Sequence, residues 1–204
     1  ANRIGFGASG RNGGQVGSGQ RWDQEKLEEK FGAENALAFW QIAEDAKKEV
    51  RNRISKHKIN CDYVSGVVQA AVNRQDLRDS FYQVDELRKK YNYKALQKLN
   101  AQEVSELLNT NFYKGGYLDL GAGHLNPLKF IMGLATAAKN LGMKIFERTK
   151  VSKIEYGPKN KLTTETGLCV QSDYLLLACN GYLGNLEPEI ASRVMPINNF
   201  ILAT

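Results

Sequence analysis

The residues with the clearest chemical meaning form a glycine-rich segment near the start of the chain. Gly5-Phe6-Gly7-Ala8-Ser9-Gly10 has the spacing G-x-G-x-x-G, but the dinucleotide-binding fingerprint requires a strand before it and a helix after it. The residues that follow, Arg11-Asn12-Gly13-Gly14-Gln15, do not predict a helix. Residues 7–15 as a whole combine free backbone N–H groups with one arginine and short hydrogen-bonding side chains, which suits a diphosphate or a polyhydroxyl chain. The alternative is a merely flexible glycine loop.

Outside this loop, few residues indicate chemistry. The chain has two histidines, too few for a metal cluster, and we predict no metal site. His124 lies between a glycine-rich stretch and the expected helix cap at Asn126; it either satisfies loop backbone groups or faces a bound ligand. Tyr113 and Tyr117 belong to an expected strand and are weak candidates for substrate binding. Cys179 is expected to be a buried thiol, because no basic partner is near it in the sequence.

Composition places the chain among ordinary globular proteins. Of its 204 residues, 42% are hydrophobic and 25% are charged, which argues against a disordered or fibrous protein. No apolar run approaches the roughly 18 residues of a membrane-spanning helix, and no leader peptide is recognised, so we expect neither a membrane span nor secretion. The three cysteines are far apart and odd in number, which predicts reduced thiols and a cytoplasmic location.

The net charge of +6 leaves a nucleic-acid-binding function open. The densest basic stretch, residues 47–58, is interleaved with acidic residues, and Glu44/Lys48 and Glu49/Arg53 stand four residues apart. Such spacing forms ion pairs on a helix surface, so we interpret the stretch as a solvated helix and expect no nucleic-acid partner. The alternative is a basic nucleic-acid-binding protein, whose affinity would fall steeply with salt.

The expected elements that position these residues alternate between helices and strands. Apolar periodicity and capping residues predict helices over residues 22–31, 33–57, 74–91, 101–108 and 127–141. Strands are expected over residues 59–64 and 66–72 as a pair, then 96–99, 112–120 and 143–146, and in a meander of 151–156, 161–166 and 168–171. Residues 173–179 read as an apolar strand buried in a parallel sheet, and residues 197–203 as a final strand. This order predicts an α/β fold with an inserted α+β region.

Four segments, in order along the chain, resemble one enzyme family. Residues 7–15 closely resemble the second flavin-contacting loop of the D-amino-acid-oxidase-like FAD oxidoreductases. Gly121-Ala122-Gly123-His124-Leu125-Asn126-Pro127 resembles the strand-to-helix junction of that family, and Val151-Ser152-Lys153-Ile154-Glu155 its adenine-side strand. Leu175-Leu176-Leu177-Ala178-Cys179-Asn180-Gly181-Tyr182 resembles its late apolar strand, which ends in Ala-x-x-Gly. The details are most similar to the γ-glutamylputrescine oxidase branch.

The resemblance implies FAD as the cofactor and gives roles to particular residues. The loop would lie along the FAD diphosphate and ribityl chain, Val151 would meet adenine through its backbone, and Ala178 and Gly181 would pass close to the cofactor. An ordinary strand core position is the alternative at Val151. His124 becomes a weak catalytic candidate near the flavin ring or substrate. The loop positions that match the family are Ser9, Arg11, Asn12, Gly13, Gly14 and Gln15.

The chemistry of the family then defines the expected function. A hydride leaves the carbon that bears an amine, the flavin accepts it, molecular oxygen usually reoxidises the flavin, and the imine hydrolyses. The resemblance implies an FAD-dependent oxidoreductase that oxidises a C–N bond of a small-molecule amine or amino acid, with a γ-glutamylputrescine-like primary amine favoured. Because the cofactor performs the difficult step, no general base is required from the protein.

The resemblance also divides the chain. Residues 1–30 correspond to the FAD-binding glycine loop and the start of the helices, residues 31–120 to a helical and β substrate-side region, and residues 121–204 to a return to the FAD-binding domain. That domain is expected to be a partial Rossmann-like domain, because the preceding G-x-G-x-x-G unit, its ribose-binding acid and the C-terminal half of the family have no counterpart. We therefore expect the middle portion of an enzyme. It is either catalytically silent and unable to hold FAD, or it functions with a partner that carries the remainder.

Overall fold

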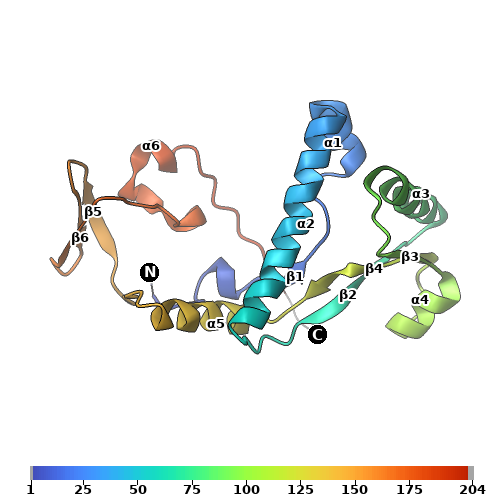
Figure 1. Ribbon diagram of the computed structural model, residues 1–204, viewed down its shortest axis with the longest axis horizontal. Helices are drawn as coiled ribbons and strands as arrows, with labels where there is room; N and C mark the ends of the chain where they lie inside the picture. The colour runs from blue at the N-terminus through green and yellow to red at the C-terminus, as the bar shows by residue number, and fades with distance from the viewer. Residues whose placement is uncertain (1, 202–204) are drawn as a thin grey trace.

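The computed structural model describes residues 2–201 and confirms the expected mixture of helices and strands. The elements are spread along one direction (Figure 1). A β-sheet with α3 (Arg74–Tyr91) and α4 (Ala101–Leu108) lies at one end, α5 (Pro127–Asn140) lies nearer the middle, and a small sheet lies at the other end. No helix in this described range is both long and apolar enough to cross a membrane.

The larger sheet is organised around one ten-residue strand, β4 (Gly115–His124). β2 (Val64–Ala70) pairs antiparallel with one edge of β4, and β3 (Leu96–Asn100) pairs antiparallel with the first half of the other edge. β1 (Gln15–Val16) pairs with the last two residues of β4 on that second edge. The long central strand therefore joins the glycine-rich start of the chain to segments that follow much later.

The expected pair of strands over residues 59–64 and 66–72 is wrong. One strand forms there, β2, and its partner is β4. Gly66 has a φ of +102°, and the register of β2 shifts between Ser65 and Val67. The Ser-Gly signal therefore marks a β-bulge, in which an extra residue bends the strand, and not the turn of a hairpin.

The helices follow their expected boundaries closely, and α3, α4 and α5 begin at residues with side-chain caps. α1 (Gln24–Phe31) and α2 (Ala33–Lys56) lie where the periodicity predicts them. Asn73 and Asn100 each accept hydrogen bonds from two backbone N–H groups and complete capping boxes at α3 and α4. Asn126 caps α5 and is followed by a proline at the first helical position, as expected.

Two hydrophobic clusters hold this part of the molecule together. The first joins α2, α3 and β3, and its buried members are Trp40, Val84, Leu87 and Leu96. The second lies beneath the start of α5, and its buried members are Ile59, Cys61 and Leu125. Removing a large apolar side chain from water stabilises a fold by about 1.5–3 kcal/mol, so these clusters fix α2 and α3 against the sheet that carries β4.

A second, smaller sheet follows α5. The expected meander is confirmed as β5 (Val151–Glu155), β6 (Asn160–Thr164) and β7 (Cys169–Ser172), which form an antiparallel sheet of their own. After it, the described chain contains short helical turns, namely η2 (Asn180–Tyr182), η3 (Gly184–Leu186) and α6 (Pro188–Ala191).

The other strands expected after α5 are wrong where the structure describes them. Residues 143–146, 173–179 and 197–201 lie in irregular backbone, and the last expected strand extends beyond the described residues. A strand of a parallel sheet needs neighbouring strands that receive its backbone hydrogen bonds and cover its side chains. In the described chain no strand pairs with these segments. As a result, Tyr174 is 93% exposed and Leu176 is 87% exposed.

Candidate functional site

Asn12 holds the glycine loop in one conformation. A short 3-10 turn, η1 (Ala8–Gly10), opens the loop. The Asn12 side-chain nitrogen donates hydrogen bonds to Ala8 O at 2.9 Å and Ser9 O at 3.2 Å, and its Oδ1 accepts one from Gly14 N at 2.9 Å. The Asn12 side chain is therefore committed to backbone groups of the loop, and its contribution to a ligand site is the shape of that loop.

Gly14 fixes the end of the loop against the junction that precedes α5. It is buried, its φ is +66°, and a methyl group placed on it would lie 1.9 Å from the carbonyl oxygen of Leu125. Leu125 N donates a hydrogen bond to Gly14 O at 2.9 Å. Only glycine adopts this backbone conformation at low cost while allowing so close an approach. The loop and the start of α5 are thus held together.

The pairing of β1 with β4 places the loop beside His124. Gln15 faces His124 in the antiparallel register, and Val64 of β2 faces His124 from the other edge. Facing residues of antiparallel strands project to the same side of a sheet. Gln15 and His124 are both exposed there. The glycine loop and the histidine considered for catalysis are therefore neighbours.

A hollow of about 470 Å³ lies between the loop and α5. Arg3 and Arg11 bring positive charge to it, Glu147 is the acidic residue of its lining, and Leu128 contributes apolar surface. The Arg11 guanidinium lies 4.5 Å from the centre of the Phe6 ring. A volume of this size lies within the range of small-molecule sites.

Two hydrogen bonds anchor the segment that leads into β5 beside the residues that precede the loop. Ile4 N donates to Glu147 Oε1 at 2.7 Å, and Arg148 N donates to Asn2 O at 2.6 Å. Val151, the position expected to meet adenine, is the first residue of β5 and follows shortly afterwards. The loop, the junction at β4 and the approach to β5 therefore converge on the first fifteen residues.

Tyr182, which the sequence analysis does not select as a site residue, also contacts the loop. A methyl group placed on Gly7 would lie 3.1 Å from the Tyr182 ring, so ring and backbone are in contact. Gly181 precedes it and is half-buried, whereas Ala178 is exposed. Tyr182 is the last residue of the segment that resembles the late apolar strand of the family, and its position there is the sequence signal for this contact.

Tyr113 and Tyr117 are not brought to the loop. Tyr117 packs against the α2–α3 cluster, and burial and the neighbouring Asp119 carboxylate raise the pKa of its hydroxyl. At roughly 3.3 Å per strand residue, Tyr117 lies about 23 Å along β4 from His124. Tyr113 precedes the first residue of β4. A role of either tyrosine in substrate binding stays a prediction.

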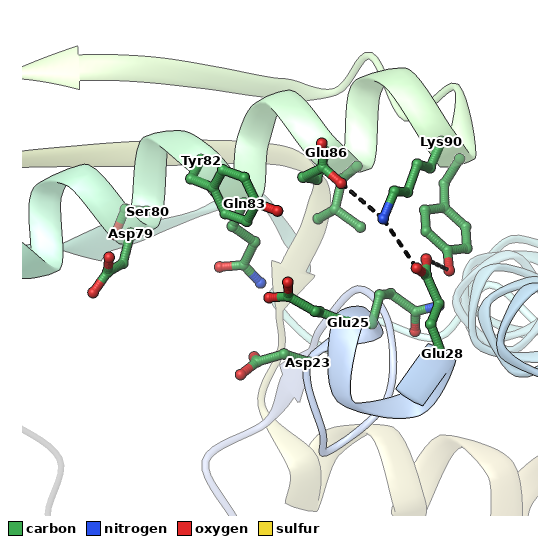
Figure 2. A pocket seen from close by; sticks show the side chains of 12 residues that line it. Asp23, Glu25, Glu28, Asp79, Ser80, Tyr82, Gln83, Glu86 and Lys90 are labelled. Atoms are coloured by element: carbon green, nitrogen blue, oxygen red, sulfur yellow. Dashed lines mark hydrogen bonds and ion pairs between the residues drawn. The ribbon is translucent and has the colours of Figure 1, made fainter. Parts of the chain in front are cut away.

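A separate hollow of about 400 Å³ lies between α1 and α3 (Figure 2) and is acidic. Its charged lining consists of Asp23, Glu25, Glu28, Asp79, Glu86 and Lys90. Lys90 Nζ lies 3.0 Å from Glu28 and 2.8 Å from Glu86, and its hydrogen bonds to Glu86 and Glu28 raise the pKa of Lys90. Tyr91 donates a hydrogen bond to Glu28 and lowers the pKa of that carboxyl. The excess of negative charge repels a diphosphate, so this hollow is unsuited to a dinucleotide cofactor.

The basic stretch of residues 47–58 does not present all of its charge to solvent. Lys47 is 3% exposed, and its Nζ lies 2.7 Å from Glu44, where the sequence predicts a Glu44/Lys48 pair. The expected pair of Glu49 and Arg53 forms, at 2.8 Å between charged atoms. Lys47 is thus unavailable to an external polyanion.

Comparison with known proteins extends over the whole chain. The family model described as "DAO: FAD dependent oxidoreductase" matches residues 1–204. The "Probable oxidoreductase OrdL" of Rhizobium meliloti (strain 1021) is 39% identical over 204 residues, and the "Gamma-glutamylputrescine oxidoreductase" of Escherichia coli (strain K12) is 33% identical over 205 residues. All of this chain is covered, but only 48% of each relative. The chain therefore spans about half the length of the curated relatives it matches.

Solved structures show the same fold at lower sequence identity. The glycine oxidase from Geobacillus kaustophilus has a TM-score of 0.68 at 19% identity, over 93% of this chain and 50% of that one. The FAD-bound L-alpha-glycerophosphate oxidase from Mycoplasma pneumoniae has a TM-score of 0.64 at 18% identity, over 89% of this chain and 47% of that one. Given the family match along its entire length, the chain belongs to the FAD dependent oxidoreductase family.

Proposed function

We propose that this protein oxidises a carbon–nitrogen bond of a small-molecule amine with FAD as its cofactor. The observation that carries the proposal is that His124 and the segment leading into β5 both contact the first fifteen residues, which contain the glycine loop. The family match identifies the cofactor as FAD. The name of the Escherichia coli relative, a gamma-glutamylputrescine oxidoreductase, supports an amine as the substrate.

The loop residues fit the phosphate-containing part of FAD. Ser9 and Gly13 are exposed and offer backbone N–H groups. Arg11, whose own N–H donates to Ala8 O, adds a guanidinium. Backbone N–H groups together with an arginine are well suited to a diphosphate. Asn12 and Gly14 keep the loop in one shape, which lowers the entropy lost on binding. The proposed cofactor-binding residues are Ser9, Arg11, Asn12, Gly13, Gly14, Gln15, Val151, Ala178 and Gly181.

When bound, FAD supplies the acceptor for a hydride that leaves the carbon bearing the amine. The chain has to bind and orient the substrate, and an ammonium substrate must also lose a proton before the hydride departs. Arg11 offsets phosphate charge, while Gln15 and His124 present polar side chains on neighbouring strands. Only an uncharged amine has the lone pair that assists departure of the hydride, so we assign to His124 the acceptance of a proton from an ammonium substrate.

The finer assignments rest on the resemblance and on the relatives. We propose a primary amine of the γ-glutamylputrescine type as the substrate, molecular oxygen as the electron acceptor and the cytoplasm as the location. The 33% identity to the Escherichia coli relative supports the first. Oxygen follows from the chemistry of the resembled family, and the location from three well-separated cysteines.

The test uses the protein expressed from its complete gene. After desalting, we expect visible flavin absorbance, and we expect γ-glutamylputrescine, but not glycine, to bleach it without oxygen. Admission of air should restore the absorbance. His124→Gln should slow bleaching while retaining flavin, and His57→Gln, the matched change of the other histidine, should not. Protein without flavin contradicts the cofactor assignment, and bleaching by glycine instead of the diamine derivative contradicts the substrate assignment.

The 204-residue chain tested by itself addresses a second possibility. Because it spans 48% of its relatives, we propose that residues 1–204 alone do not retain FAD and are catalytically silent. The purified chain, mixed with FAD and desalted, should show no flavin absorbance. Retention of the cofactor would overturn this assignment and show that the loop and β5 suffice for binding.

A further inference from the structure

Four side chains from four segments meet in a buried polar cluster, which we call the Asp119 cluster. Its members are Ser18 from the segment after β1, Lys47 of α2, Tyr93 from the connection between α3 and β3, and Asp119 of β4. Lys47 is 3% exposed and Asp119 is 7% exposed. Charged groups so far from water require full hydrogen bonding, because an unsatisfied buried charge is strongly destabilising.

Both carboxylate oxygens of Asp119 accept hydrogen bonds. Its Oδ2 accepts a hydrogen bond from Ser18 Oγ at 2.6 Å, and its Oδ1 accepts one from Tyr93 OH at 2.6 Å. The same Oδ1 accepts from Gly121 N at 2.9 Å and Ala122 N at 3.2 Å. Gly121 is required beside it, since a methyl group there would lie 2.0 Å from the Tyr93 hydroxyl oxygen.

Ser18 and Tyr93 make equivalent hydrogen bonds within the cluster. Lys47 Nζ donates to Ser18 Oγ at 2.6 Å and to Tyr93 OH at 3.1 Å, and lies 2.7 Å from Glu44 Oε1. Each hydroxyl accepts a hydrogen bond from Lys47 and lies within hydrogen-bond distance of Asp119. The two hydroxyl oxygens also lie 2.8 Å apart, so Ser18 and Tyr93 belong to one connected network. Burial and the hydrogen bond to Asp119 raise the pKa of Tyr93 far above its usual value, which keeps the donated proton on the tyrosine.

The two hydroxyls differ in what they are attached to. Ser18 follows β1 by two residues, whereas Tyr93 lies in a connection remote from the glycine loop in sequence. β1 pairs with β4 through only two residues, too short a ladder to be stable alone. The hydrogen bond between Leu125 N and Gly14 O holds one end of β1, and the hydrogen bond between Ser18 and Asp119 holds the other.

We propose that Asp119 is a positioning residue for the cofactor loop, acting through Ser18 to hold β1 and Gln15 in register against His124. The Lys47 ammonium donates a hydrogen bond to Ser18 Oγ and so orients the hydroxyl proton of Ser18 toward Asp119. The link to FAD rests on the function proposed above, but the link between Ser18 and the position of β1 does not.

The test compares two substitutions that remove equivalent hydroxyls. Ser18→Ala and Tyr93→Phe each delete a hydroxyl that donates to Asp119 and accepts from Lys47, and each removes the 2.8 Å contact between the two hydroxyls. Urea unfolding should therefore show similar losses of stability. In the protein expressed from its complete gene, Ser18→Ala should raise the FAD dissociation constant about tenfold, the size expected for one hydrogen bond to a charged group. Tyr93→Phe should change that constant less than about twofold. Backbone amide exchange in the peptide of residues 11–20 should accelerate in Ser18→Ala alone.

A purely structural role for the cluster predicts that both variants alter the dissociation constant and the exchange equally. Equal shifts in the two variants, or no shift in either, overturn the proposal. If the unsubstituted protein holds no FAD, the proposed function fails. The exchange comparison then decides by itself whether Ser18 and Asp119 position β1.

Discussion

The two parts of the structure on either side of α5 differ in how far their apolar side chains are buried. Residues 24–125 fold into helices and a sheet around shared hydrophobic clusters. Beyond α5, Leu183 is the one described hydrophobic residue that is buried. Tyr174, Leu176 and Phe200 are 93%, 87% and 95% exposed. The first part has a core, whereas the second has local structure without one.

The difference shows that hydrogen bonding and burial are separate requirements. The meander of β5, β6 and β7 forms because each strand finds its partner a few residues away. Residues 173–179 have a comparable strand-like pattern, but their backbone and apolar side chains need partners from elsewhere. α3 satisfies both requirements, with a capping box at its start and Trp40 of α2 against its buried face.

The strongest test of this comparison replaces one large aromatic side chain in each part. Trp40→Ala removes a 5%-exposed side chain that packs on Tyr91 and Tyr93, and should lower the free energy of unfolding by about 3–5 kcal/mol. Tyr174→Ala removes a 93%-exposed side chain and should change it by less than about 0.5 kcal/mol. Urea denaturation followed by circular dichroism measures both. A large loss with Tyr174→Ala would show that the second part has a core after all.

A smaller effect is expected from two glycines with similar backbone angles. Gly167→Ala, in the turn before β7, places a side chain at a φ of +83° with open space around it, and should cost about 1–2 kcal/mol. Gly14→Ala has the same kind of strain, at +66°, and also forces a methyl group against Leu125 O, which adds about 1–3 kcal/mol. The free energy of unfolding should therefore fall further in Gly14→Ala than in Gly167→Ala. Equal costs would mean that the loop is not pressed against the start of α5.

The smallest effect concerns the cysteines. Burial, aided by Asp62, raises the pKa of Cys61, while Cys169 is exposed and Cys179 is half-buried. Labelling by a thiol reagent near neutral pH should be slower at Cys61 than at Cys169 by about tenfold or more, because the protein must open to expose it. Mass spectrometry of the labelled peptides measures the rates. Labelling of Cys61 as fast as that of Cys169 would contradict the burial of Cys61 in the part of the chain that precedes α5.

The same thiol gives the first part a pH dependence of defined sign. In the unfolded chain the Cys61 thiol ionises near its ordinary pKa of 9.0, whereas burial raises its pKa in the folded protein. The unfolded state therefore binds fewer protons above that pH, and stability falls as the pH rises. Cys61→Ala should remove this contribution, and Cys169→Ala serves as the exposed control.

Helices and the meander could be predicted from sequence because their signals are local. Asn73, Asn100 and Asn126 mark helix starts by hydrogen bonds to the next turn, and apolar periodicity needs no knowledge of partners. The glycine loop is identifiable for a similar reason, since its residues are contiguous in the sequence. The error at Ser65-Gly66 arose because a bulge and a turn use the same residue types.

The contacts that complete the site could not be predicted in this way. That Gln15 faces His124, that Tyr182 lies against Gly7, and that Ser18 reaches Asp119 are all results of long-range packing. Lys47 shows the same limit, because its sequence neighbours indicate a solvated helix while a serine distant in sequence receives its hydrogen bond. Which side of a helix is covered depends on elements that the local pattern does not describe.

The hydrogen bonds that join Ile4 to Glu147 and Asn2 to Arg148 have a consequence for biosynthesis. The glycine loop leaves the ribosome over a hundred residues before His124, which at about 5–20 residues per second means a wait of roughly 5–20 s. The cluster around Trp40 and Val84 can assemble during that interval. The glycine loop is thus synthesised early and packed late, and it stays solvated on the nascent chain until its last partners emerge.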